Sequence, residues 1–434
     1  MSAFDRIIGY AAVKAEMERF CDVLKNPDKY KKLGVTMPRG ILLEGEPGIG
    51  KTLMAKCLIE ESGCKSYLLR KNRPDGDFVN EIRSTFEKAR SDSRAIVFLD
   101  DMDKYANEDT EHADAEEYVA IQACIDDCAD TEVFVIATIN CRYCLPDSLI
   151  RAGRFDKVIF MRAPRGEDSR NIVKYYLSQK QVMGDVDIEE LAGLMEGDSC
   201  AELESVINEA AINAGFEGRE QIEQKDILQA LYRMIFDAPK SIDENERKYL
   251  KNIAVHEAGH AVVSEALEPG SVSLVSVVNY SGSTEGVTVI RKPDDFNISM
   301  IAQEHEVIRK LGGKAATELI FGVGDTGCRC DIRDAIKIIT RFVSDYCFYG
   351  FNSFKSFNGE CESDYILENR DRLISEELDK YYRQAKQIII ENRELFDILT
   401  RELIERKTLT HKDIVANKEK CIKNIEITTG SCTI

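Results

Sequence analysis

The sequence predicts an α/β P-loop domain with a helical lid, followed by a mainly α-helical domain. Three observations support this fold class. Short apolar runs alternate with amphipathic segments from residue 40 to about residue 162, a glycine-rich loop follows the first run, and a His-Glu-x-x-His sequence that starts at His256 lies inside a helical pattern. Apolar strands that alternate with helices form parallel sheets with crossover connections. We therefore expect a parallel sheet in the first half of the chain.

Five apolar runs are the predicted strands of this sheet, at residues 41–43, 67–69, 96–99, 133–138 and 158–160. The strand pattern then stops, and helical periodicity predicts helices at residues 168–179, 201–215 and 225–234. We expect these helices to form the lid.

The second half of the chain begins with a predicted helix from residue 246 to about 267, followed by a strand-like stretch at 272–290 that glycines interrupt. Further helices are predicted at residues 300–311, 315–321, 331–346, 363–392 and 393–407. The tail after Lys420 shows no clear periodicity. The predicted division is 1–165 for the α/β part, 166–238 for the lid, 239–245 for a charged linker that starts with Pro239, and 246–434 for the helical domain.

Composition limits the class of protein. A chain of 434 residues is long for one domain. The formal net charge of −19 argues against nucleic acid as a partner, because nucleic-acid binding requires clustered positive charge. The 14 cysteines are scattered, so we expect free thiols in a reducing environment; the pairs Cys141/Cys144 and Cys328/Cys330 lack the second pair that a structural zinc site needs. No window is long and apolar enough to predict a membrane-spanning helix.

Residues 45–52, Gly-Glu-Pro-Gly-Ile-Gly-Lys-Thr, match the phosphate-binding loop pattern. We expect backbone N–H groups of this loop to surround the phosphates of ATP, Lys51 to neutralise the β and γ oxygens, and the Thr52 hydroxyl to hold Mg²⁺. The alternative is a glycine-rich turn without function. It is disfavoured because the loop follows a predicted strand and opens a predicted helix, which is the context that the motif requires.

Polar residues follow two of the predicted strands. Asp100 and Asp101 end the run at 96–99, and Asn140 lies just after the next strand. We expect Asp100 to bind Mg²⁺, Asp101 to act as the base for the attacking water, and Asn140 to orient that water. Further along, Arg151 and Arg154 are candidate arginine fingers for a neighbouring subunit; the alternative is a solvated pair of charges.

His256 and His260 are four residues apart in a helical pattern, so both side chains lie on one face and can bind one Zn²⁺. Glu257 is placed to act as general base on a water held by the metal, and peptide hydrolysis is the natural chemistry of such a site. A solvated helix face is the alternative, against which the apolar flanking residues argue. Composition cannot choose the third zinc ligand from the 77 acidic residues.

Together these motifs resemble the FtsH-type family of AAA metalloproteases, from about residue 4 to about residue 415. The matching segments are residues 4–9, 45–52, 140, 151–156 and 208–211 in the first part, and 256–263, 286–288, 312–319 and 326–332 in the second. The resemblance implies an AAA ATPase domain with a helical lid, followed by a zinc metallopeptidase domain. It implies Asp331 as the third zinc ligand and Glu318 as an acid next to the site.

The resemblance also implies ligands and partners. The implied nucleotide-binding residues are Ile8, Gly9, Pro47, Gly48, Ile49, Gly50, Lys51, Thr52, Leu53 and Asp100. The implied assembly is a homohexamer, in which each subunit pulls unfolded or tagged protein substrates through a central pore. Family members usually begin with transmembrane helices, whereas Met1 lies almost inside the predicted ATPase domain; a natural soluble form or a shortened chain would each explain this difference. From the absence of a predicted membrane-spanning window, we expect this chain to be cytoplasmic.

Three residues or segments depart from the family pattern. Asp101 stands where the family usually has glutamate, and Cys200 stands where the lid usually has glycine. The segment at residues 73–79 is charged and shifted relative to the aromatic pore loop of the family. Phe78 is our candidate for the residue that grips the substrate, and its alternative is an anchor in the core.

Three functions follow from these patterns. The leading hypothesis is an ATP-dependent zinc endopeptidase that unfolds and translocates its substrates. The departures at Asp101 and in the pore loop keep open a nucleotide-gated remodelling or scaffold protein with a degenerate motor or protease. The third is an energy-independent peptidase in which ATP serves assembly. The intact set of His256, Glu257, His260 and Asp331 favours the protease.

Overall fold

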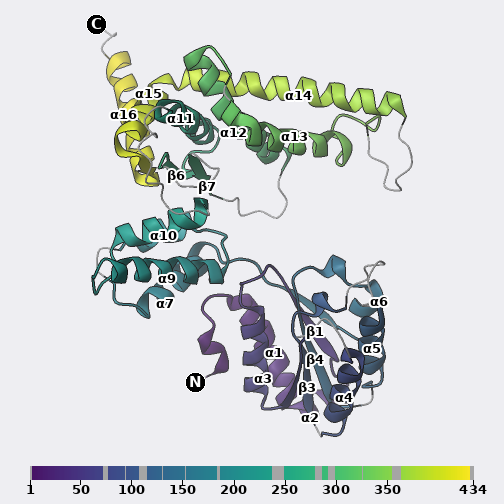
Figure 1. The fold of residues 1–434 in the computed structure, drawn as a ribbon. Coiled ribbons are helices and arrows are strands. Elements are labelled where there is room, and N and C mark those ends of the chain that lie inside the picture. Colours follow the sequence, from purple (N-terminus) through teal and green to yellow (C-terminus); the bar gives the residue numbers. More distant parts are fainter. Residues whose placement is uncertain are drawn as a thin grey trace. The chain divides into compact units, whose positions relative to one another are not determined.

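The computed structural model describes most of the chain. The described residues are 2–71, 77–92, 94–106, 115–129, 131–151, 153–182, 186–236, 249–278, 286–291, 299–324, 326–353 and 363–430, without the side chains of residues 115, 236 and 422–430. The chain divides into two compact units, Met1–Leu228 and Gln229–Ile434, which are considered separately (Figure 1). The predicted linker at 239–245 lies outside the described residues, and the predicted domain boundaries stay a prediction.

The first unit contains the predicted five-stranded sheet. Its strands are β1 (Gly40–Glu44), β2 (Lys65–Leu69), β3 (Ala95–Leu99), β4 (Val133–Ile139) and β5 (Lys157–Phe160). They are all parallel, in the order β2-β3-β4-β1-β5. The parallel pairing confirms the α/β class that the alternating pattern predicts.

Helices cover both faces of this sheet (Figure 1). Successive side chains of a strand point to opposite faces. Ile41 and Leu43 pack in one core with α1 and α3, and Leu42 packs in another with α4 and α5. Burial on both faces explains why the inner strands β1, β3 and β4 are almost continuously apolar. The helices and short turns of this part are η1 (Ala3–Arg6), α1 (Ala11–Lys25), α2 (Pro27–Lys31), α3 (Lys51–Ser62), α4 (Phe78–Arg90), η2 (Met102–Lys104), α5 (Ala115–Asp126), η3 (Arg142–Cys144) and α6 (Asp147–Ile150).

The described residues of the lid form four helices, one more than predicted. They are α7 (Gly166–Ser178), α8 (Ile188–Leu194), α9 (Cys200–Phe216) and α10 (Gln224–Phe236). The additional helix, α8, is too short to show a clear helical periodicity, and the capping residue before it is its main signal in the sequence. The side chain of Asp187 accepts a hydrogen bond from the Glu190 N–H at 2.9 Å and so caps the helix.

The second unit is mainly helical, as predicted. Its helices are α11 (Leu250–Leu267), α12 (Met300–Phe321), η5 (Thr326–Cys328), α13 (Arg329–Ser344), α14 (Asp364–Glu391), α15 (Arg393–Arg406) and α16 (His411–Gly430). A small antiparallel sheet has the order β7-β6-β8, from β6 (Val272–Ser276), β7 (Val287–Ile290) and β8 (Thr408–Thr410). The prediction missed β8, which is only three residues long, and was wrong about the tail, because α16 continues past Lys420.

Helices α11 and α12 cross at a pair of glycines. A Cβ on Gly259 would lie 2.5 Å from the Gly312 carbonyl oxygen, and a Cβ on Gly312 would lie 2.9 Å from the Gly259 oxygen. The prediction of two helices broken at Gly312 and Gly313 was therefore wrong. The glycines do not end α12; they allow its backbone to touch α11 inside a continuous helix.

None of the helices in the described part of the chain combines the length and the apolar character that crossing a bilayer requires.

Candidate nucleotide and metal sites

The phosphate-loop residues have the backbone shape that their glycines predict. Gly48 and Gly50 have φ values of +79° and +94°, and Gly50 caps α3. These are left-handed conformations that glycine adopts without strain. A Cβ on Gly48 would also lie 2.9 Å from Ser199 Oγ at the start of α9. The loop thus reaches the first turn of a lid helix.

Lys51 is buried at the start of α3. Its ammonium group donates to the carbonyl oxygens of Gly45 and Glu46, both at 2.7 Å, and to Asn140 Oδ1 at 3.0 Å. Burial lowers the pKa of Lys51, and the carboxylates of Asp101 and its neighbours offset this only in part. The site therefore holds a poorly compensated positive charge, which suits phosphate oxygens.

Asp100 is the centre of a hydroxyl network. Its Oδ1 accepts hydrogen bonds from Thr52 Oγ1 and Thr138 Oγ1, both at 2.9 Å. Thr138 Oγ1 in turn accepts the Asp101 N–H at 2.9 Å. Threonine hydroxyl and carboxylate oxygens are hard ligands of the kind that Mg²⁺ prefers, so Thr52 and Asp100 fit the predicted ion. Thr138 was not among the predicted site residues; its signal in the sequence is a polar residue near the end of a buried apolar strand.

Asp101 and Asn140 lie at the same edge of the sheet. Asp101 has a left-handed backbone (φ 54°), and its Oδ2 accepts a hydrogen bond from Lys104 Nζ at 2.7 Å. The Asn140 N–H donates to Asp103 Oδ2 at 2.9 Å. The structure thus brings together the residues predicted to bind phosphate and magnesium and to orient water.

The predicted adenine-side residues Ile8 and Gly9 lie beside the lid. A Cβ on Gly9 would be 2.8 Å from the carboxyl carbon of Asp168, which accepts the Tyr10 N–H at 3.2 Å. The Tyr10 hydroxyl lies 3.6 Å from the Cys200 sulfur. The remaining predicted positions differ in exposure: Ile49 is in the core, whereas Pro47 and Leu53 are exposed.

The two predicted arginine fingers have different environments. Arg151 is exposed, whereas Arg154 is 6% exposed. The Arg154 guanidinium makes two hydrogen bonds to Asp126, at 2.9 and 2.6 Å, and a third to the Ser148 carbonyl. These contacts give the donors of Arg154 partners in its own chain, which favours a structural role for this residue. The finger role stays a prediction for both arginines.

Phe78 is not placed to grip a substrate. It is 7% exposed and meets the Tyr105 ring edge-to-face, with centroids 5.1 Å apart. Both rings belong to the core beneath α4. The burial favours the alternative, an anchor for that helix. Residues 73–76 of the predicted pore segment lie outside the described residues.

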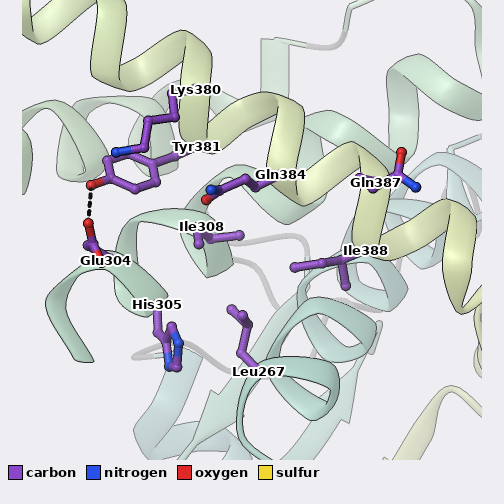
Figure 2. A pocket seen from close by; sticks show the side chains of 9 residues that line it. All are labelled: Leu267, Glu304, His305, Ile308, Lys380, Tyr381, Gln384, Gln387 and Ile388. Carbon is purple, nitrogen blue, oxygen red and sulfur yellow. Dashed lines mark hydrogen bonds between the residues drawn. The ribbon is translucent and has the colours of Figure 1, made fainter. Parts of the chain in front are cut away.

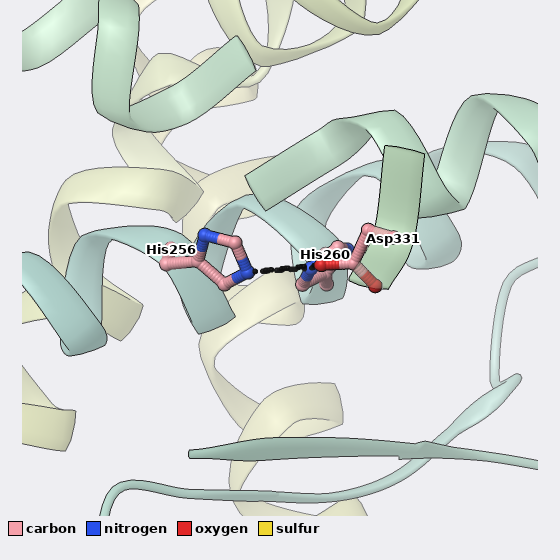
Figure 3. A group of neighbouring side chains, drawn as sticks. All are labelled: His256, His260 and Asp331. Atoms are coloured by element: carbon pink, nitrogen blue, oxygen red, sulfur yellow. Dashed lines mark hydrogen bonds and ion pairs between the residues drawn. The ribbon is translucent and has the colours of Figure 1, made fainter. Parts of the chain in front are cut away.

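In the second unit, three side chains converge on one point (Figure 3). His256 and His260 are one turn apart on α11, and Asp331 is in the first turn of α13. Asp331 Oδ2 lies 3.3 Å from His256 Nε2 and 3.4 Å from His260 Nε2, and the two nitrogens are 3.0 Å apart. The three groups offer ligand atoms within 4.8 Å of one another. Two imidazole nitrogens and a carboxylate are a donor set typical of catalytic zinc.

Backbone groups of α12 hold the two imidazoles in place. His260 Nδ1 lies 2.7 Å from the Arg309 carbonyl oxygen, which accepts its proton and leaves Nε2 directed at Asp331. Gly313 lies directly against His256: a Cβ there would be 2.5 Å from Nε2. Gly313 belongs to one of the motifs of the sequence, but its contact with His256 was not predicted, because the contact depends on the crossing of α11 and α12.

The three groups also influence one another electrostatically. Burial lowers the pKa of His260, but the neighbouring Asp331 carboxylate outweighs it and the pKa is raised. Burial raises the pKa of Asp331, but His256 and His260 outweigh it and the pKa is lowered. The site therefore stabilises positive charge between the three side chains, as a divalent cation requires.

Glu257 is buried next to these ligands at a cleft of ≈ 900 Å³. Thr288 Oγ1 on β7 donates to Glu257 Oε2 at 2.7 Å, and Gly286 leaves no room for a Cβ beside the carboxylate. The cleft is lined by Tyr249, Asn252, Ile253, His256, Glu257, His260, Gly286, Val287, Thr288, Ile290, Glu306, Arg309, Lys310, Phe321, Val323, Gly324, Thr326, Gly327, Arg329, Cys330 and Asp331. The metal ligands thus face a space large enough for a peptide.

Glu318, which the family resemblance implies as an acid next to the site, makes its contacts mainly with α14. Its carboxylate pairs with Lys386 at 2.6 Å and Lys314 at 3.4 Å, and it accepts a hydrogen bond from the Tyr382 hydroxyl. Lys386 and Tyr382 lower its pKa to about 2. We find these contacts, and none to the two histidines, among the described side chains. Glu318 therefore connects α12 to α14.

A smaller cavity of ≈ 370 Å³ lies between α11, α12 and α14 (Figure 2). Its lining includes Leu267, Ile308 and Ile388, and at its rim the Tyr381 hydroxyl donates to Glu304 Oε1 at 2.8 Å. None of the three metal ligands is among the residues that line it. This cavity is distinct from the metal site.

Comparisons with known proteins agree with both sites. The model of peptidase family M41 matches residues 240–416, that of the ATPase family associated with various cellular activities (AAA) matches residues 41–163, and that of the AAA+ lid domain matches residues 185–229.

Several curated relatives carry the name ATP-dependent zinc metalloprotease FtsH. The protein of Aster yellows witches'-broom phytoplasma is 30% identical, over 95% of this chain and 63% of its own length. The protein of Mycoplasma mobile is 30% identical, over 95% of this chain and 62% of its own length. FtsH 2 of Symbiobacterium thermophilum is 30% identical, over 95% of this chain and 73% of its own length. The chain thus spans less than two thirds of the first two relatives. The order of its matched domains and its identity to these proteins show that the chain belongs to the FtsH family of AAA zinc metalloproteases.

Proposed function

We propose that the chain is an ATP-dependent zinc metalloendopeptidase that unfolds and translocates protein substrates. The observation that carries this proposal is the convergence of His256, His260 and Asp331 next to Glu257, in an open cleft. A structural zinc site would be closed by a fourth protein ligand, whereas a catalytic one leaves a position open to the substrate. The alternative of a degenerate remodelling or scaffold protein is disfavoured, because the catalytic set is intact.

Peptide hydrolysis would use groups that are already oriented. Zinc, when bound by His256, His260 and Asp331, would supply a Lewis acid that polarises the scissile carbonyl and activates water. The Glu257 carboxylate accepts a proton from the attacking water and passes it to the leaving amine. The hydrogen bond from Thr288 fixes one carboxylate oxygen, so that Glu257 keeps its orientation in the cleft.

The position of β7 supports an extended peptide as substrate. In the described sheet, β7 is an edge strand that pairs with β6, and Val287, Thr288 and Ile290 line the cleft. An edge strand presents backbone groups to which a peptide can add as a further strand. A substrate segment can pair with β7 in this way only if it is not folded. A folded substrate must therefore be unfolded before it is cleaved.

The first unit would supply the energy for unfolding. The backbone of the phosphate loop and Lys51 would hold the phosphates, and Thr52 and Asp100 would hold Mg²⁺. Asp101 accepts a proton from the water that Asn140 orients. In the homohexamer that we propose, Arg151 reaches the γ-phosphate on a neighbouring subunit.

Free thiols such as Cys57 and Cys124, which are buried, support a reducing, cytoplasmic environment.

Removal of the general base provides the first test. We expect Glu257→Gln to bind zinc like the parent but to cleave casein at least about 100-fold more slowly, because proton transfer is lost. Glu376→Gln, the same change on the exposed surface of α14, serves as control and should cleave at the parent rate. Zinc content and ATP-stimulated casein cleavage are the measurements. Undiminished cleavage by Glu257→Gln would exclude the proposed mechanism.

The glycine under His256 provides a second test. A methyl group at position 313 would displace the imidazole, so we expect Gly313→Ala to weaken zinc binding about 10- to 100-fold, as loss of an orienting contact does at other sites. Competition with a chelator measures this affinity. The matched control is Gly215→Ala, a helical glycine in α9 with open space around it. Equal zinc affinity in Gly313→Ala and the parent would refute the role of this contact.

Substitution of Arg151 should affect ATP turnover, whereas substitution of Arg154 should affect stability. We expect Arg151→Ala to lower ATP turnover in the assembled protein without changing stability, because the side chain is exposed. Arg154→Ala should lower the stability of the first unit by about 1–3 kcal/mol, because it leaves Asp126 and the Ser148 carbonyl without their partner. ATPase assays and denaturant unfolding distinguish the two effects. If Arg151→Ala lowered stability and Arg154→Ala lowered only ATP turnover, Arg154 would be the arginine finger and Arg151 the structural residue.

A further inference from the structure

Two cysteines lie at the two ends of a tight turn at the nucleotide edge of the sheet. Cys141 is the N-cap of η3 and Cys144 is its last residue, and the Cys144 N–H donates to the Cys141 carbonyl oxygen at 3.4 Å. This is the hydrogen bond that closes a four-residue turn, whose end residues lie close together. Burial and the neighbouring Cys141 raise the pKa of Cys144, in keeping with two thiols at the ends of one turn.

The turn is open to reagents from solvent. Cys144 is exposed, Cys141 is half-buried, and Tyr143 between them is 91% exposed. A disulfide requires Cα atoms about 4.4–6.8 Å apart, a separation that the two ends of a single tight turn provide. The turn therefore permits a disulfide between its two ends.

The same turn is attached to the phosphate loop at two points. Asn140, which precedes Cys141, accepts the hydrogen bond from Lys51 Nζ. The Arg142 N–H, inside the turn, donates to Glu44 Oε1 at 3.1 Å, and Glu44 is the last residue before the loop. A covalent constraint on the turn would thus act on the residues that hold the loop and orient water.

We propose that Cys141 and Cys144 form a reversible disulfide that slows ATP turnover, so that thiol oxidants regulate the ATPase. The inference rests on the proposed function for its effect on turnover, whereas the formation of the bond does not depend on it. Transient disulfides of this kind act as redox sensors in reducing compartments.

The oxidant is a low-molecular-weight disulfide. One protein thiolate attacks it, forms a mixed disulfide and releases one small thiolate. The second protein thiolate then attacks the protein sulfur of the mixed disulfide and releases the other. In sum, the protein loses two protons and two electrons, and the small disulfide becomes two small thiols. An excess of reduced thiol reverses both steps.

The test compares the full chain in reduced and oxidised glutathione. Peptide mass spectrometry should detect a Cys141–Cys144 link, with a mass about 2 Da below that of the two free thiols. ATP turnover should fall about tenfold on oxidation, since displacement of a positioning group by about 1 Å has an effect of this order or larger. Dithiothreitol should restore it.

Variants separate this pair from the other thiols. Cys144→Ser should keep the turnover of the reduced parent and lose the response to oxidation. Cys64→Ser, which removes another half-buried thiol of the same unit, should respond like the parent. Absence of the linked peptide would overturn the proposal, as would a link that leaves turnover unchanged, or inhibition that persists in Cys144→Ser. A reduced parent that shows no ATPase activity would instead refute the proposed function, while the mass measurement still tests the bond.

Discussion

Helices α11 and α12 touch backbone to backbone at Gly259 and Gly312, because neither residue has a side chain. This contact brings two groups of α12 to the metal ligands: the Arg309 carbonyl reaches His260, and Gly313 packs against His256. The orientation of both imidazoles thus depends on the separation of the two helices. Any side chain at the crossing would push α12 away and leave His260 without its acceptor. The geometry of the metal site is therefore a property of helix packing as much as of its ligands.

The two sites use the same physical device, in which a buried charged group is held by partners before a ligand arrives. In the nucleotide site, Thr52 and Thr138 hydrogen-bond to Asp100, and carbonyl oxygens hold the Lys51 ammonium. In the metal site, Thr288 holds Glu257. These side chains lose their conformational freedom when the protein folds. Ligand binding and proton transfer therefore require little further rearrangement of them.

Much of the fold and most residues of the two sites could be predicted from the sequence. The five strands and the lid helices follow from apolar periodicity, and the three metal ligands from the His-Glu-x-x-His motif together with the family resemblance. What could not be predicted depends on contacts between segments distant in the chain. A glycine pair inside a helix has the same local signal as a helix end, so α12 was predicted as two helices. Arg154 and Phe78 have residue types suited to function, and only their burial against Asp126 and Tyr105 shows their structural roles.

The central claim is that His256, His260 and Asp331 bind one zinc ion. Zinc content after exhaustive dialysis, measured by elemental mass spectrometry, tests it most directly in the parent, Asp331→Asn and Asp334→Asn. Asp334 is a matched control, because it lies one turn along the same helix and pairs with lysines at the surface. We predict about one zinc ion per chain in the parent and in Asp334→Asn, and a strong loss in Asp331→Asn. A parent without zinc, or equal zinc in all three proteins, would contradict the account.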